Sequence, residues 1–345
     1  MPHLHGASRS CICCSQMHPF VILEFIAYQF YDYQSNKRLV FYGAMISTQA
    51  KFPVFINETL SPDEWDQQIA DHKKEIGSLI DDYLERRQHQ QKDPVLDFLF
   101  EYYAFRPSHL KTWSPGFGRL LIDGANHQWN FDQMKIREGN AYLDIKQFRK
   151  DRISSLRWII NVLEQSAEQK PSFGCFGMHE WAMVYKKSQN QVRHSQIPLR
   201  MDEQQLAEFV ESRPLVCTHF DAFRFFSEAA KPQNKFELNR QKFAEMEQPG
   251  CLHTNMDLYK WAFKMYPWIS SNLIRKAFKL AIKTRYIDMK ASPYDLSERG
   301  LEPIKIETDA GRKEYIRRQQ AIFEHSQPIR RRLIEEYQLL LENLC

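Results

Sequence analysis

Three short segments of this 345-residue chain place a cysteine, a histidine and a carboxylate close together. They are CFGMHEW at 175–181, CTHFD at 217–221 and CLHTNMD at 251–257. A carboxylate beside an imidazole fixes the tautomer of the ring and raises its basicity, which serves both proton transfer and metal binding. We therefore predict that these segments supply the catalytic residues, namely His179, Glu180, His219, Asp221, His253 and Asp257.

We expect the three histidines to converge on one pocket, because buried imidazoles and carboxylates are costly unless they satisfy one another. His253 and Asp257 are four residues apart and would share one face of a helix. Each pair taken alone is also typical of a protein core, where a histidine is simply hydrogen-bonded and a free cysteine is buried. Convergence of all three histidines on one pocket would favour a functional site over three separate core histidines.

A metal site is the alternative interpretation of the same residues. In that case His179, His219, Asp221 and His253, together with Glu180 and Asp257, hold one or two metal ions. Imidazole and carboxylate ligands suit iron, zinc or manganese. The three cysteines do not form the paired C-x₂-C pattern of structural zinc sites.

Several common catalytic motifs are missing from the chain. It has no G-x-x-x-x-G-K-[ST], no G-x-S-x-G and no G-x-G-x-x-G after a predicted strand, so P-loop ATPases, α/β-hydrolases and Rossmann dehydrogenases lose support. Met183 stands where the second histidine of H-E-x-x-H would be, which excludes that class of zinc protease.

A second candidate region, 106–118, interleaves Arg, His, Lys and Trp with turn residues. Such a mixture can hold phosphate on backbone N–H groups while an aromatic ring stacks on a base. The Pro115–Gly118 part is equally typical of a plain turn beneath the core. Across the chain, the residues that we predict to contact substrate are Arg106, Trp113, Trp181, Arg193, Arg224, Lys260 and Asp288.

The elements that must position these residues are mainly helices. Ser61-Pro62-Asp63-Glu64 has the serine cap, the proline and the acidic first turn of a helix start. Hydrophobic spacing predicts further helices at 95–105, 146–165, 201–210, 221–230, 235–247, 254–266, 270–286 and 310–343. Leu120–Ile122 is short enough to be a strand or a buried loop edge. The predicted fold is mainly α, a single large helical domain over 61–345 with a few short strands or extended joints.

Residues 1–60 are predicted to be an N-terminal extension. Aromatic and β-branched residues from Phe20 to Ile46, broken at Gln34–Lys37, indicate a possible β-hairpin. Cys11, Cys13 and Cys14 could bind a metal, although an extension outside the folded domain explains them more simply. Seven cysteines, an odd number, and no apolar signal segment favour a reducing, cytoplasmic location.

The charge balance limits the partners of the protein. With 47 Lys and Arg against 43 Asp and Glu the net charge is only +4, so nucleic acid would require a local basic patch. The arginine runs 317–318 and 330–332 are typical of a solvated helix face, with a phosphate-contacting patch as the alternative. No uncharged run reaches the ~18 apolar residues of a membrane helix, so we expect a soluble protein without a membrane contact or a protein partner.

Several stretches, in order, resemble a bacterial family labelled 3-methyladenine DNA glycosylase. The similarity covers the chain from about Trp65 to the C-terminal helix. The stretches are DFLFEYY at 97–103, Arg106-Pro107, WSPGFG at 113–118, CFGMHEWAMVY at 175–185, HFDAFRFF at 219–226, EQPGCLH at 247–253, MDLYKW at 256–261 and DMKASPYDL at 288–296.

The resemblance implies an enzyme that cleaves the N-glycosidic bond of an alkylated purine in DNA, without a cofactor. Such a reaction needs a flipped-out base, an aromatic pocket and a carboxylate that supports the sugar cation or activates water. Asp221 or Asp257 would be that carboxylate, His219 or His253 its proton partner, and Trp181 the stacking surface. A metal-dependent hydrolase or oxygenase remains the alternative, and a non-catalytic binding module is the third possibility.

The helix-hairpin-helix fold of other DNA glycosylases is not expected here. Ser114–Gly118 resembles their hairpin, but Asp123 follows too soon to be their catalytic aspartate. It also lies in Leu-Leu-Ile-Asp-Gly, which has the character of a strand end.

Overall fold

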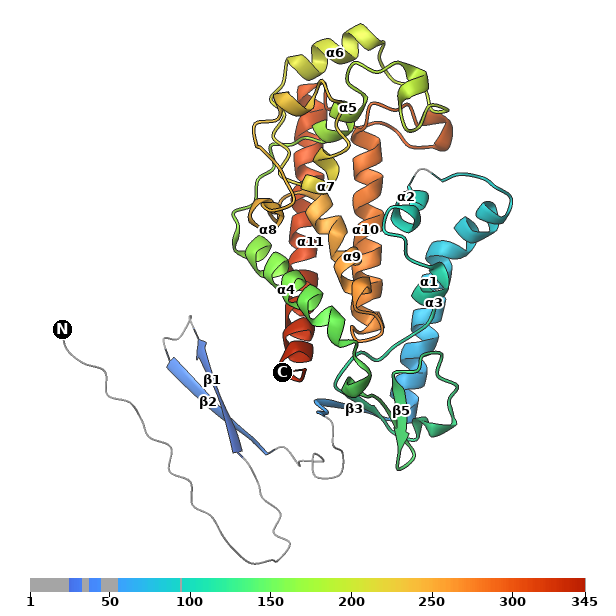
Figure 1. Cartoon of the computed structure of the whole chain (residues 1–345), viewed down its shortest axis with the longest axis vertical. Coiled ribbons are helices and arrows are strands. Elements are labelled where there is room, and N and C mark those ends of the chain that lie inside the picture. The colour runs from blue at the N-terminus through green and yellow to red at the C-terminus, as the bar shows by residue number, and fades with distance from the viewer. Residues whose placement is uncertain (1–24, 33–36, 45–54, 94, 345) are drawn as a thin grey trace, which may run out of the picture. The chain divides into compact units, whose positions relative to one another are not determined.

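The computed structural model describes residues 25–32, 37–44, 55–93 and 95–344, which belong to two compact units divided after Pro53 (Figure 1). In the first unit, strands β1 (Phe25–Asp32) and β2 (Lys37–Ala44) pair antiparallel, from Phe25 opposite Ala44 to Asp32 opposite Lys37. Both strands lie in the segment where the sequence predicted a hairpin. Residues 34–36 of its predicted turn at 34–37, and the cysteines at 11–14, lie outside the described residues.

The second unit is mainly helical, as predicted, and carries one small mixed sheet. The helices are α1 (Pro62–Gln88), α2 (Leu96–Glu101), α3 (Pro107–Lys111), α4 (Ile153–Glu168), α5 (Met178–Val184), α6 (Glu203–Glu211), α7 (Phe220–Phe223), α8 (Phe243–Met246), α9 (Leu252–Lys264), α10 (Ser271–Ala291) and α11 (Asp309–Glu342). Three of these helices, α9, α10 and α11, stand side by side in the middle of the unit (Figure 1).

The start of α1 follows the predicted cap. The side chain of Glu64 reaches back to the backbone N–H of Ser61 at 2.8 Å, and Pro62 occupies the first helical position. The helix buries Trp65, Ile76 and Ile80 on one face, as an amphipathic surface helix does.

His72 makes α1 sensitive to acid. The ring is 1% exposed and its Nε2 donates to the carbonyl of Leu110 at 2.8 Å. Burial lowers the pKa of His72 to about 4, although the hydrogen bond to the Leu110 carbonyl raises it; the nearby Arg275 lowers it and Glu75 raises it by smaller amounts. The unfolded chain takes up a proton below about pH 6.5 that the folded chain refuses, so stability falls as the pH drops from about 6.5 toward 4.

We expect this histidine to cost up to about 3 kcal/mol of unfolding free energy between pH 7 and pH 4. Urea denaturation of the protein and of His72→Gln at both pH values measures the effect. The variant cannot gain a proton there, so its loss of stability should be smaller. A partial loss is expected to remain, because burial also lowers the pKa of His194 to about 4. Parallel losses in both proteins would contradict the prediction.

The mixed sheet contains β3 (Glu58–Leu60), β4 (Arg119–Leu121), β5 (Met134–Arg137) and β6 (Asn140–Leu143), in the order β3-β4-β6-β5. Strand β3 is parallel to β4, and the other neighbours are antiparallel. Only β4 was predicted as a possible strand. The β5–β6 turn, Glu138-Gly139, has two positive φ angles, 50° and 80°, as a tight hairpin turn requires.

The turn at 114–118 is a structural joint. Ser114 is fully buried and its hydroxyl donates to the carbonyl of Pro267 at 2.6 Å, while the N–H of Phe117 donates to Trp268 at 2.8 Å. Gly116 has a φ of 83°, and a β-carbon there would lie 2.7 Å from the backbone nitrogen of Ser270. The chain turns here, as the plain-turn interpretation predicted, and its backbone is bound to the loop before α10.

Gly116→Ala is expected to lower the free energy of unfolding by about 2 kcal/mol, from backbone strain and from collision with Ser270. Gly174→Ala is the matched control, since its β-carbon would meet only the Val216 side chain at 3.6 Å. Urea denaturation of both variants tests the prediction. Equal stability of the two would refute it.

Helices α9, α10 and α11 confirm the predicted helices at 254–266, 270–286 and 310–343. They pack on one another, and α4 packs on α11. α10 runs five residues beyond its predicted end at 286, to Ala291, and this extra turn carries Asp288. The added length proves important for the site described below.

Two predicted helices are largely wrong. The segments 221–230 and 235–247 contain only the four-residue helices α7 and α8. Between them the side chain of Asn234 donates to the carbonyls of Cys217 and Phe236 and accepts from the N–H of Cys217, which holds a loop in place. The predicted helix 95–105 is also shortened, to α2, because Ala104 has a φ of 53°.

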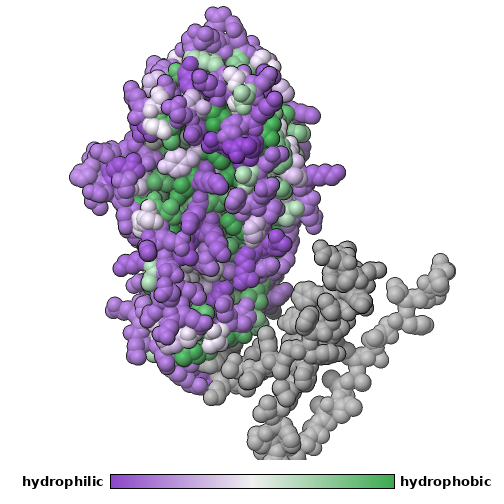
Figure 2. All heavy atoms as spheres, turned by 180° about the vertical axis from the view of Figure 1, so that it is seen from behind, coloured by the Kyte–Doolittle hydropathy of each residue, from purple (hydrophilic) through white to green (hydrophobic). Residues whose placement is uncertain are grey.

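The surface of the second unit is largely hydrophilic, although Figure 2 shows hydrophobic residues exposed in the middle of one face. Arg317 and Arg318 both pair with Glu314 one turn away, as a solvated helix face predicts. Arg330 differs from that prediction, because it is 1% exposed and donates to Asn255 at 2.7 Å. Among the described residues, no helix has both the length and the apolar character needed to cross a bilayer.

Candidate functional site

The three predicted histidines converge, as expected. The ring centroids of His179 and His253 are 4.3 Å apart, and those of His253 and His219 are 5.3 Å apart. His179 is on α5, His219 caps α7 and His253 is on α9, so three separate elements meet here. Each of these residues is at most 8% exposed.

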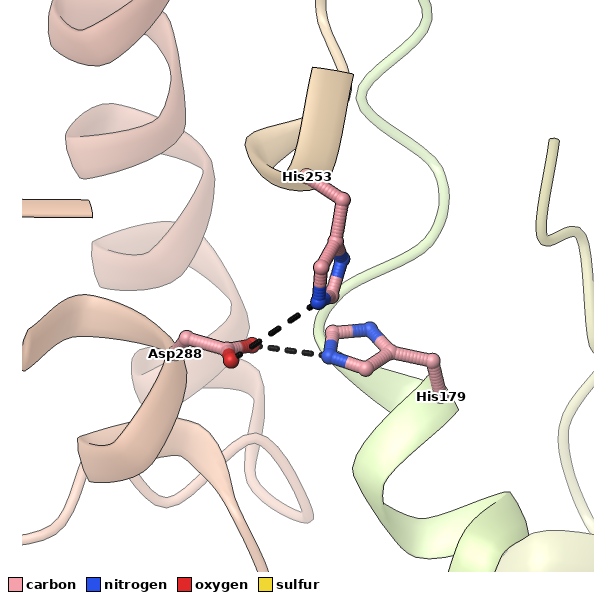
Figure 3. Close-up of side chains that lie close together, drawn as sticks. All are labelled: His179, His253 and Asp288. Carbon is pink, nitrogen blue, oxygen red and sulfur yellow. Dashed lines mark hydrogen bonds and ion pairs between the residues drawn. The ribbon is translucent and has the colours of Figure 1, made fainter. Parts of the chain in front are cut away.

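His179, His253 and Asp288 form the first cluster (Figure 3). Nε2 of His179 lies 2.7 Å from Oδ1 of Asp288, and Nε2 of His253 lies 3.9 Å from Oδ2 of the same carboxylate. Asp288 is supplied by α10 and is completely buried. Both imidazoles therefore point their Nε2 atoms toward one carboxylate.

Arg285 and Cys175 complete this cluster. Nη1 of Arg285, one turn before Asp288, contacts that carboxylate and donates to Glu180 at 2.9 Å. Sγ of Cys175 lies 3.8 Å from Nδ1 of His179. Burial opposes charge on His179 and on Asp288. The attraction between these two groups nevertheless raises the pKa of His179 well above its usual value and lowers that of Asp288. Burial and the neighbouring His179 lower the pKa of His253, which is therefore neutral.

The second cluster contains His219, Asp221 and Asp257, with Lys260 between the carboxylates. Nε2 of His219 is 3.9 Å from Asp257, while Nδ1 lies 3.0 Å from Glu247 and must carry the proton of that hydrogen bond. Nζ of Lys260 contacts Asp257 and lies 3.2 Å from Asp221. The ammonium group thus binds both carboxylates of this cluster.

The charges of the second cluster support one another. Burial opposes protonation of His219, but Glu247 and then Asp257 raise its pKa above the usual value. Lys260 shows the same balance, with burial outweighed by Asp257 and Asp221, so its pKa is raised. Tyr103 donates to the other oxygen of Asp257 at 2.8 Å.

A pocket of about 250 Å³ is lined by His253 of the first cluster and by His219, Asp221 and Asp257 of the second. Aromatic rings form much of its wall, and acids and bases lie along its floor. The aromatic residues are Phe98, Tyr102, Tyr103, Phe225 and Tyr294, and the charged or titratable floor residues are Glu180, His219, Asp221, His253, Asp257 and Arg285. A pocket of this kind suits a flat, partly polar ligand.

Five of the six predicted catalytic residues line this pocket, and the sixth, His179, lies against His253 with ring centroids 4.3 Å apart. Among the predicted substrate contacts, Arg193 lines the pocket, Arg224 lies 3.6 Å from Asp221, and Lys260 belongs to the second cluster. Asp288 does not line the pocket and is fully buried.

Three predicted substrate contacts are placed elsewhere. Trp181 is 0% exposed and its indole N–H donates to the carbonyl of Ala291 at 2.9 Å, so it belongs to the core rather than to the pocket wall. Trp113 is buried beside Trp129, with ring centroids 6.3 Å apart. Arg106 is exposed at the start of α3. Aromatic stacking in this pocket must therefore come from the rings that line it, namely Phe98, Tyr102, Tyr103, Phe225 and Tyr294.

The sequence interpretation missed Arg285, Glu247 and Tyr103. Arg285 precedes Asp288 by three residues, a spacing that puts both on one face of a helix, so a longer predicted α10 would have revealed it. Glu247 and Tyr103 lie in unrelated loops and carry no comparable spacing signal. Their roles depend entirely on tertiary folding.

Both clusters have the ligand types of a transition-metal site, and in each the ligand atoms lie within 4.8 Å of one another. The two clusters differ in how a lysine or arginine side chain already contacts their carboxylates. Lys260 binds both carboxylates of the second cluster. In the first cluster Arg285 contacts only Oδ2 of Asp288, leaving Oδ1 facing His179. The first cluster is thus the better fit for an ion.

The comparisons with known proteins give no further guidance to the function. Against family models, curated proteins and solved structures, this chain has no match.

Proposed function

We propose that this protein is a metalloenzyme, a hydrolase or oxygenase that holds one transition-metal ion between His179, His253 and Asp288. The observation that carries the proposal is the meeting of two imidazole nitrogens and a carboxylate from three helices. Nε2 of His179 lies 2.7 Å from Oδ1 of Asp288, and Nε2 of His253 lies 3.9 Å from Oδ2 of the same carboxylate. Ligand atoms bound to one ion at about 2.1 Å are at most about 4.2 Å apart, so both separations suit a shared ion.

The chemistry of the donors narrows the choice of ion. Two imidazoles with one carboxylate, and room for further ligands, suit iron, zinc or manganese. The carboxylates around the pocket outnumber the arginine and lysine side chains that contact them, and they raise the pKa values of His179 and His219; an ion between His179 and Asp288 would take the place of the proton on His179. The substrate would enter above His253, where Phe98 and Tyr102 can stack on a planar ring.

The chain's own residues supply acid and base groups for such a reaction. His219 is oriented by Glu247, which leaves its Nε2 toward Asp257 at the pocket floor. A carboxylate and imidazole held this way can receive or deliver a proton. Glu180 lines the pocket and is held in place by Arg285.

The metal content of the untagged full chain tests the proposal. About one equivalent of iron, zinc or manganese per chain is expected by elemental analysis. Removal by a chelator should lower the melting temperature, and adding the ion back should restore it. Protein that arrives metal-free, takes up none of the three ions and shows no change in melting temperature would overturn the proposal.

A second candidate is metal-free cleavage of the N-glycosidic bond of an alkylated purine, the reaction that the resemblance implies. It is favoured by the stacking rings of the pocket beside Asp221 and Asp257, because that reaction needs an aromatic pocket and a carboxylate. Release of free 3-methyladenine from alkylated DNA by metal-free protein, followed chromatographically, would establish it. Loss of that release in Asp221→Asn or Asp257→Asn would identify the carboxylate.

A further inference from the structure

A second, smaller cavity of about 90 Å³ adjoins the pocket. The two share Phe98, Arg193 and His194 in their walls. The guanidinium of Arg285 lies 4.4 Å from the ring centroid of Phe98, and that of Arg193 lies 5.9 Å from it. Phe98 therefore separates the titratable pocket floor from a basic outer cavity.

The outer cavity is bordered by three exposed cations, Lys92, Arg193 and Arg299. In the described part of the chain none of them pairs with a carboxylate, and Arg299 donates only to the carbonyl of Lys92, at 3.3 Å. Two carboxylates, Asp97 and Glu101, also border it. Asp97 is already bound by the hydroxyl of Tyr83 at 3.1 Å and the N–H of Asp93 at 2.8 Å, so its charge is partly satisfied.

We infer that the outer cavity binds the phosphate of the substrate, and that the substrate is a free nucleoside monophosphate whose base enters the aromatic pocket. Arginine offers paired N–H donors that match phosphate oxygens, and Arg193 stands at the junction of the two cavities. His194 lies beside these cations, and its neutral ring adds a hydrogen-bonding group.

The shape of the outer cavity favours a terminal phosphate over a continuing nucleic-acid strand. Its walls come from the chain before α2, from α2, from residues 193–196 and from Arg299. These segments surround a space too small for a second nucleotide. The inference rests on the proposed function only in taking the aromatic pocket as the substrate site, and it does not depend on a metal.

Calorimetric titration of the full chain with adenosine 5′-monophosphate and with adenosine tests the inference. The monophosphate is expected to bind at least about tenfold more tightly, as charge-assisted hydrogen bonds to phosphate would give. Arg193→Gln should remove that difference. Arg213→Gln, which changes an exposed arginine at the end of α6, should keep it.

Equal affinities for the two probes, or no binding of the monophosphate, would overturn the inference. So would tighter binding of a single-stranded pentanucleotide, which would indicate a strand rather than a free nucleotide. Titrations of metal-loaded and metal-free protein separate this test from the proposed function. If the protein takes up no metal but still binds the monophosphate more tightly than adenosine, only the metalloenzyme proposal is wrong. If the protein takes up metal but binds both probes equally, only the phosphate site is wrong.

Discussion

Asp288→Asn is expected to abolish stoichiometric metal binding and to lower the free energy of unfolding by about 3–5 kcal/mol. The carboxylate is completely buried and contacts both His179 and Arg285. Asparagine keeps the size but not the charge, so Arg285 would lose part of its compensation in a low-dielectric site. Elemental analysis and urea denaturation measure the two effects.

His253→Gln is the matched variant for this prediction. His253 approaches Asp288 only to 3.9 Å, which is too long for a hydrogen bond, and its ring is neutral. We therefore expect this variant to lose the metal while its stability changes by only about 1 kcal/mol. Full metal occupancy in His253→Gln would contradict the assignment even if Asp288→Asn failed to fold.

Lys260→Met is expected to raise the metal content from one equivalent to two. The ammonium group of Lys260 binds Asp221 and Asp257 in the second cluster, where His219 supplies an imidazole. Methionine has a similar length and no charge, so two carboxylates and an imidazole would be left for an ion. Before metal is added, the variant should be less stable by about 3–5 kcal/mol, because the buried Asp257 and the partly buried Asp221 lose this partner.

Added zinc or manganese should then restore the stability of Lys260→Met, in proportion to the logarithm of the free metal concentration. Lys264→Met, one turn further along α9 at an exposed position, is the control and should hold one equivalent. If Lys260→Met still binds one equivalent of metal and its stability does not respond to added metal, the ammonium group of Lys260 does not occupy a metal site.

Local sequence signals predicted the elements whose stability is local. The serine cap and proline at 61–62 start α1 where the hydrogen bonds of Ser61 and Glu64 are found. The long apolar repeats of α9, α10 and α11 are equally visible in sequence. The helices predicted at 221–230 and 235–247 are largely wrong, because the apolar residues of these segments pack from loops. The side chain of Asn234 holds those loops in place.

The candidate site was predictable in its composition but not in its connections. The His/carboxylate segments could be found because histidine and carboxylate lie within four residues of each other. Their partners cannot be read in the same way, since His179 meets Asp288 across 109 positions and His219 meets Glu247 across 28. Trp181 shows the converse, because an aromatic residue next to a site residue can face the core on the other side of a short helix.

The ion pairs between α5 and α10 also bear on how the chain folds during synthesis. Glu180 meets Arg285 across 105 positions, so α5 leaves the ribosome long before its counter-charges do. Until α10 emerges, His179 and Glu180 can be buried only at the cost of desolvating unpaired groups, which keeps the α5 segment in water. Docking of α10 then satisfies His179 and Glu180 at once, so the part of the protein around α5 and α10 should become native in one late, cooperative step.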